Sequence, residues 1–145
     1  MRAPFQVLAI PFRKIGRSLE FCVFHRRRHD TWQFISGGGG DAETPLQAVQ
    51  REVAEESGVA TDDFISLRSM CYIRSDIYPE QYRNNWPKDM YIIPEYSFGF
   101  ECNEDIRISD EHSGFRWVSY EEAMDLLKYD SNKTAMYELK CRLEE

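Results

Sequence analysis

The chain has 145 residues and a formal net charge of −7, with 42% hydrophobic and 14% aromatic residues. This length allows one domain, residues 1–145, with a substantial core, and the composition is typical of a globular protein. The negative charge argues against a stable nucleic-acid partner or a membrane surface, and no apolar run approaches the roughly 18 residues that span a bilayer. The four cysteines form no CxxC pair, so we expect reduced thiols in the cytoplasm rather than a zinc site or a disulfide framework.

Two apolar, β-prone runs, residues 5–12 and 19–25, open the chain. The polar segment between them contains Gly16, and this pattern predicts a β-hairpin. A third, short strand is expected at residues 32–35. The glycine run at 37–40 follows it directly, and we expect the backbone to turn tightly there because glycine adopts conformations that other residues avoid.

A helix is predicted after the glycine run. Thr44 is the expected N-cap, Pro45 suits the first helical position, and Gln47 completes a capping box. Gly58 is the expected stop signal at the other end. The apolar residues expected on the buried stripe of this helix are Leu46, Val49 and Val53.

Apolar runs predict three more strands in the second half of the chain, at residues 63–74, 90–101 and 115–118. The polar, aromatic and proline-containing segment 75–88 is expected to be a loop. Pro94 lies inside one predicted strand, which implies an edge position or a bulge because proline has no N–H to donate.

Two further helices are predicted near the end of the chain. Ser119 with Glu122 forms a capping-box pattern for the first, and Ser131 or Asn132 is expected to open the second. Strands mixed with helices in this order predict an α/β protein, an α/β/α sandwich around a mixed sheet.

An acidic cluster lies on the helix that follows the glycine run. Glu52, Glu55 and Glu56 are spaced i, i+3 and i+4, so they share one face, where like charges repel one another. A solvated acidic face is the ordinary interpretation of such a cluster. The added presence of Gly37 and Glu43 at set distances favours a metal site, because a divalent cation turns this repulsion into coordination.

Together these residues form the motif Gly37-x5-Glu43-x7-Arg51-Glu52-Val53-x-Glu55-Glu56-x-Gly58-Val59. It resembles the Nudix box at every fixed position. The resemblance implies the Nudix fold, an α/β/α sandwich with a mixed β-sheet. It also implies hydrolysis of a pyrophosphate bond in a small phosphorylated substrate, with Mg²⁺ as the cofactor and Mn²⁺ as an alternative.

The resemblance also implies roles for individual residues. Glu55 and Glu56 are expected as the principal metal ligands, with Glu52 in the same cluster and a backbone carbonyl at Gly37. A general base is needed as well, and Glu55 and Glu56 are candidates for it. A more distant acid completes the site in many family members, and Glu111 is the first choice for this catalytic and metal-binding position.

Glu101 is the second choice for the distant acid. Glu43 and Arg51 are expected to pair and to orient the helix against the glycine run. The alternative for this pair is an ordinary surface ion pair, which contributes little to stability.

Within the family, several short segments resemble the bacterial dihydroneopterin triphosphate pyrophosphatases of folate synthesis: Trp32-Gln33, Glu111-His112, Trp117 and Ser131-Asn132. This resemblance implies cleavage of a nucleoside or pterin triphosphate to a monophosphate and pyrophosphate. The candidate substrate-binding residues are Arg28, Arg83, Asn84 and His112. Aromatic residues between 78 and 86 are candidates for stacking on a flat base.

Other functions remain open at this stage. A Nudix hydrolase with the same chemistry could instead act on diadenosine polyphosphate, ADP-ribose or capped RNA. A non-catalytic, nucleotide-binding Nudix domain is the least favoured alternative, because such domains usually lose the acids that are present here. The sequence predicts no oligomeric state.

Overall fold

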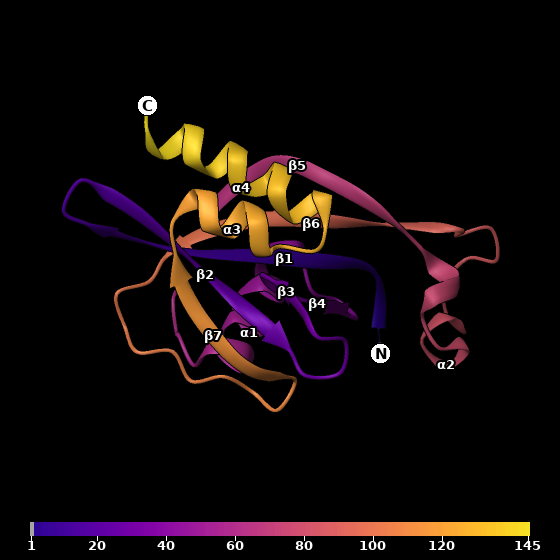
Figure 1. Ribbon diagram of the computed structural model, residues 1–145. Helices are drawn as coiled ribbons and strands as arrows, with labels where there is room; N and C mark the ends of the chain where they lie inside the picture. The colour runs from indigo at the N-terminus through magenta and orange to yellow at the C-terminus, as the bar shows by residue number, and fades with distance from the viewer. Residues whose placement is uncertain (1) are drawn as a thin grey trace.

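The computed structural model describes residues 2–145, and a seven-stranded mixed sheet forms its centre (Figure 1). The strands are β1 (Arg2–Ile15), β2 (Ser18–Arg26), β3 (Thr31–Gln33), β4 (Ile35–Gly40), β5 (Ile65–Arg74), β6 (Ile92–Glu101) and β7 (His112–Val118). The helices are α1 (Pro45–Ser57), α2 (Glu80–Arg83), α3 (Tyr120–Leu126) and α4 (Asp130–Leu143), with a 3₁₀ turn, η1 (Ser75–Ile77). None of the helices in this part of the chain is long and apolar enough to cross a membrane.

The long strand β1 organises the sheet. It runs parallel to β6 on one side, and on the other side it pairs antiparallel with β4 along its first half and with β2 along its second half. β5 continues the sheet beyond β6, while β3 and β7 both pair with β2. The predicted hairpin between the first two strands is confirmed, and Gly16 takes a positive φ of 61° at its tip.

Side chains alternate between two covered faces along β1. Val7 and Ala9 pack on the α1 side, whereas Leu8 and Ile10 pack on the side of α3 and α4. Figure 1 shows α1 on one side of the sheet and α3 and α4 on the other. Because both faces are apolar and covered by helices, the predicted α/β/α sandwich with a mixed sheet is confirmed.

The glycine run is where the structure differs most from expectation. The predicted tight turn is wrong: residues 35–40 form strand β4, and none of its glycines has a positive φ. The chain turns one step later, where Ala42 takes a φ of 65°. These glycines are therefore needed for the space above them rather than for backbone freedom.

Helix α1 begins as predicted. The Thr44 hydroxyl accepts a hydrogen bond from Gln47 N at 3.2 Å, and the Gln47 side chain returns one from Thr44 N at 2.9 Å. Gly58 ends the helix with a φ of 75°. Leu46, however, is 50% exposed, so its predicted burial is wrong, and Ala48 takes its place in the core beside α1's valines.

Pro94 is accommodated at a local edge, as predicted. It pairs with Tyr72 of β5, but the pairing of β6 with β1 begins only at Glu95. One side of β6 is thus unpaired at Pro94, where a missing N–H removes no bond to β1. The neighbouring segment 75–88, predicted to be a loop, contains the short helices η1 and α2.

The two C-terminal helices begin differently. The Ser119 hydroxyl caps α3 by accepting a hydrogen bond from Glu122 N at 3.1 Å, as predicted. Helix α4 starts after Tyr129, without a side-chain cap, so neither Ser131 nor Asn132 opens it. Asn132 is instead buried and accepts a hydrogen bond from Phe34 N at 3.0 Å, which ties α4 to the sheet.

Glu138 joins α4 to the end strand β5. Its carboxylate accepts hydrogen bonds from the backbone N–H groups of Arg68 and Ser69 at 2.8 and 2.7 Å, from the Ser69 hydroxyl, and from Arg142. Burial alone would raise the pKa of Glu138, but these donors outweigh it and lower the pKa to about 2. The ionised carboxylate is therefore a stabilising contact.

We expect Glu138→Gln to lower the free energy of unfolding by about 2 kcal/mol at pH 7. A folded-state pKa below the ordinary value gives stability that is fully present above about pH 4.5 and is lost as the pH falls toward about 2. Urea unfolding at pH 7 and pH 3.5 measures both effects, with the exposed Glu121→Gln as the control. An equal loss at both pH values would show that ionisation of Glu138 does not contribute.

Candidate functional site

Arg51 on α1 connects the helix to the strand before it. Its guanidinium donates two hydrogen bonds to Glu43, at 2.8 and 2.9 Å, and a third to the Gly38 carbonyl at 2.9 Å. Glu43 also accepts a hydrogen bond from Gly40 N at 2.6 Å. The hydrogen bond from Arg51 is the main reason why the pKa of Glu43 is lowered, and the same contact raises the pKa of Arg51.

Arg51 also contacts two acids on its own helix. Its Nη1 lies 2.9 Å from Glu52 Oε1 and 3.3 Å from Glu55 Oε2. A positive charge between the two carboxylates offsets the repulsion that their spacing creates. Glu55 is 54% exposed in its side chain, so it is the most open acid of the cluster.

Glu52 lies against the strand β4 where Gly37 has no side chain. A Cβ atom added at Gly37 would be 2.1 Å from the carboxyl carbon of Glu52. Glu52 is only 9% exposed, and burial raises its pKa to about 7 despite the contact with Arg51. Gly37 therefore provides the space in which the Glu52 carboxylate sits.

Glu56 is buried, at 5% exposure, so the acidic cluster is not a uniformly solvated face. Its carboxylate accepts a hydrogen bond from the Ser109 hydroxyl at 2.9 Å, and His112 Nδ1 lies 3.1 Å away. Burial alone would raise the pKa of Glu56, but the contacts with His112 and Ser109 lower it below its usual value. The helix face turns inward because the segment that leads into β7 packs against it.

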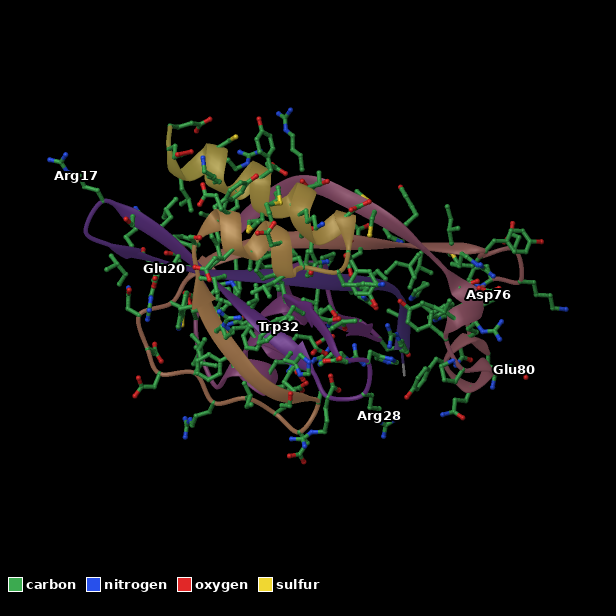
Figure 2. All side chains as sticks on the ribbon, viewed as in Figure 1. Arg17, Glu20, Arg28, Trp32, Asp76 and Glu80 are labelled. Atoms are coloured by element: carbon green, nitrogen blue, oxygen red, sulfur yellow. The ribbon has the colours of Figure 1, made fainter. Side chains whose placement is uncertain are left out.

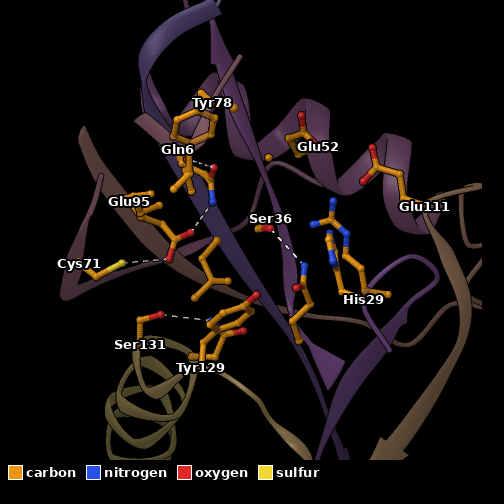
Figure 3. Close-up of a pocket in the computed structure, with 18 of the residues that line it drawn as sticks. Gln6, His29, Ser36, Glu52, Cys71, Tyr78, Glu95, Glu111, Tyr129 and Ser131 are labelled. Carbon is orange, nitrogen blue, oxygen red and sulfur yellow. Dashed lines mark hydrogen bonds between the residues drawn. The ribbon is translucent and has the colours of Figure 1, made fainter. Parts of the chain in front are cut away.

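A cavity of about 610 Å³ opens beside this cluster (Figure 3). At one end its walls include Gly37, Gly38 and Glu52. Figure 3 shows Glu111 on the same side as Glu52, with Gln6, Glu95 and Cys71 across the cavity. A cavity of this size accommodates a nucleotide-sized molecule.

None of the four candidate substrate residues lines this cavity. Arg28, Arg83 and Asn84 are absent from its walls, and His112 is 2% exposed and contacts Glu56. Arg28 lies in an exposed turn at the periphery (Figure 2). Arg83 donates to the Tyr78 carbonyl at 3.0 Å, so it contacts the backbone of a residue that lines the cavity.

Residues other than these four candidates line the cavity. Arg26, at the end of β2, lines the cavity in place of Arg28. Glu111 lines the cavity, whereas Glu101, the second choice, does not. The buried acid Glu95 and the polar residue Gln6 were missed, although a charged or amide side chain inside an apolar strand is a detectable signal.

The box offers donors that suit a divalent cation. Within residues 2–145, no three His, Cys, Asp or Glu side chains are grouped as a ready-made metal cluster, and Arg51 contacts two of the acids. The donors available are nevertheless hard carboxylate oxygens, and the space above Gly37 already admits one of them. This chemistry fits Mg²⁺ or Mn²⁺.

The NUDIX domain model matches residues 4–139. The chain belongs to the Nudix hydrolase family, which acts on pyrophosphate bonds and generally uses divalent metal ions. It is similar to the RNA pyrophosphohydrolase of Francisella tularensis, with 33% identity over 66% of this chain and 66% of that protein's length. The chain thus spans just under two thirds of that relative.

Solved structures agree on the fold. A NUDIX hydrolase structure from Listeria monocytogenes superimposes with a TM-score of 0.87 and 42% identity, covering 98% of this chain and 95% of that one. The dihydroneopterin triphosphate pyrophosphohydrolase of E. coli superimposes with a TM-score of 0.71 and 22% identity, covering 92% of each chain. At this identity the second likeness shows the fold and not the substrate.

We expect Gly37→Ala to displace the Glu52 carboxylate, because the new methyl group would occupy its position. Only the end of a flexible side chain must move, so the free energy of unfolding should change by less than about 1 kcal/mol, while Mg²⁺ affinity should fall about ten- to a hundredfold. Calorimetric Mg²⁺ titration and urea unfolding measure the two quantities. Gly114→Ala is the matched control, since nothing lies within 4 Å of its added Cβ; equal Mg²⁺ affinity in both variants would contradict the placement of Glu52.

Proposed function

We propose that this chain is a single-domain, Mg²⁺-dependent pyrophosphohydrolase that cleaves a nucleoside or pterin triphosphate to a monophosphate and pyrophosphate. The observation that carries the proposal is one cavity, about 610 Å³, with Gly37 and Glu52 of the box at one end and polar and aromatic groups, Gln6, Glu95 and Tyr78 among them, at the other. A polyphosphate needs cations among these carboxylates, and a flat base needs the second kind of wall. The four free thiols are consistent with a reducing, cytoplasmic setting.

Glu52, Glu55 and Glu56, with the carbonyl of Gly37, are the residues that would hold the cation. When bound, Mg²⁺ neutralises phosphate charge and lowers the pKa of a bound water. Glu43 and Arg51 orient the acids by tying α1 to β4. Their rigid arrangement reduces the reorganisation needed to reach the transition state.

Glu111 is our candidate for the general base that accepts a proton from the attacking water. It is exposed, lines the cavity, and lies on the side of Glu52 in Figure 3. Glu55 and Glu56 remain the candidates within the box. Arg26 is positioned to contact a phosphate, and His112 acts on Glu56 rather than on the substrate.

A second candidate substrate is the 5′-triphosphate end of an RNA. The relative from Francisella tularensis is an RNA pyrophosphohydrolase, and an arginine run, residues 26–28, borders the cavity through Arg26. Arg27 is held by the carbonyls of Asp110 and His112, which leaves Arg28 exposed to solvent. The net charge of −7 limits such binding to this local cationic turn.

A substrate panel tests the proposal. The protein is incubated with Mg²⁺ and dihydroneopterin triphosphate, nucleoside triphosphates, diadenosine tetraphosphate, ADP-ribose or a 5′-triphosphorylated RNA, and product release is measured. We expect the highest kcat/KM for a small triphosphate, with pyrophosphate as a product. Faster turnover of the RNA would establish the second candidate instead, and no turnover of any compound would refute hydrolysis.

We expect Glu56→Gln to reduce kcat by at least about a thousandfold, because the amide loses both the charge and an oxygen donor. The side chain keeps its volume and its Ser109 contact, so the variant should remain folded by circular dichroism. Glu122→Gln, on the surface helix α3, is the control and should keep full activity. Full Mg²⁺-dependent activity of Glu56→Gln would rule out this residue as a metal ligand.

A further inference from the structure

Three neighbouring strands place polar side chains in one row at the end of the cavity far from the box. Gln6 of β1 is the register partner of Glu95 of β6, which in turn is the partner of Cys71 of β5. All three line the cavity. Gln6 Nε2 donates to Glu95 Oε2 at 2.7 Å, and Cys71 Sγ donates to Glu95 Oε1 at 3.4 Å (Figure 3).

Glu95 is a buried acid without a cation beside it. It is 5% exposed, and the ion pairs among residues 2–145 do not include it. An ionised carboxylate accepts about four hydrogen bonds, and within the described part of the chain Glu95 accepts two, both from uncharged donors. Burial raises the pKa of Glu95, so donors supplied by a ligand would favour its ionised form.

The groups around Glu95 are held in place. The Tyr78 hydroxyl donates to Gln6 Oε1 at 2.7 Å, and Arg2 Nη2 donates to the same oxygen at 3.3 Å. This leaves the Gln6 amide with its NH₂ group directed to Glu95. Arg2 Cζ lies 4.5 Å from the centre of the Tyr78 ring, which fixes the tyrosine as well.

This row of polar side chains lies where the base of a bound nucleotide-like molecule would lie. Glu52 and Glu95 line the same cavity from opposite sides, so a ligand with phosphates near Glu52 extends its ring system toward Glu95. Tyr78 and the half-exposed Tyr129 add aromatic surface to the walls. Flat rings stack on such surface, while a polar group at the end of the cavity reads their edge.

We propose that Glu95 selects substrates whose flat heterocycle presents an amino group next to a ring N–H, the edge shared by guanine and by 2-amino-4-oxopteridines. Two parallel N–H groups donate to the two oxygens of one carboxylate, as the guanidinium group of an arginine does. Adenine and hypoxanthine lack this donor pair, so one oxygen of the buried carboxylate would receive no hydrogen bond from the base. The inference rests on the proposed function only for the placement of phosphates at the other end.

Calorimetric binding in Mg²⁺ buffer tests the selection with two matched ligand pairs: GMP against IMP, and 2-amino-4-oxopteridine against 2,4-dioxopteridine. We expect the wild-type protein to bind the amino-bearing member of at least one pair about tenfold or more tightly. Glu95→Gln should abolish that ratio. Glu80→Gln, whose side chain projects from α2 at the periphery in Figure 2, should preserve it.

The pair that shows discrimination identifies whether guanine or a pteridine is preferred. Equal affinities within both pairs, no binding of any ligand, or an unchanged ratio in Glu95→Gln would each overturn the proposal. Since the wild-type ratio needs no variant, misfolding of Glu95→Gln would not prevent a decision. Hydrolysis of triphosphates without base preference would remove this inference and leave the proposed function standing, whereas selective binding without hydrolysis would do the reverse.

Discussion

The arrangement of the site depends on the contacts that the guanidinium group of Arg51 makes. It binds both oxygens of Glu43 and the carbonyl of Gly38, and it also reaches Glu52 and Glu55. A planar group with five donors can satisfy these partners at once, which a lysine ammonium cannot. One side chain thereby ties the turn after β4 to the helix and offsets the repulsion among the acids.

The glycine run complements this contact by leaving space at the sheet. Among residues 2–145, β4 pairs with β1 alone, and at Gly37, Gly38 and Gly39 an added Cβ would meet the side chains of Glu52, Arg2 and Phe5. The acids of α1 lie on one side of the sheet, while Gln6 and Leu8 face the other. Without side chains on these glycines, Glu52 and the row around Glu95 open into one cavity.

Local patterns predicted much of this architecture. The hairpin around Gly16, the capping box at Thr44 and the stop at Gly58 depend on contacts between residues a few positions apart, so the sequence displays them. The errors at Leu46 and Asn132 have the opposite cause. Distant segments that pack against each helix decide whether Leu46 is buried and whether Asn132 caps a helix or lies in the core, and local sequence patterns do not show that packing.

For the candidate site, the sequence by itself determined the acids, their spacing on one helix face and the family to which the chain belongs, because a motif within 23 consecutive residues is local information. Only the tertiary structure decided that Glu56 is buried against Ser109 and His112, that Arg26 rather than Arg28 borders the cavity, and that Gln6, Cys71 and Glu95 meet. Those three residues come from three strands, and Gln6 on β1 is far from the other two in the sequence. Strand order and register bring them together, and neither is fixed by any short stretch of sequence.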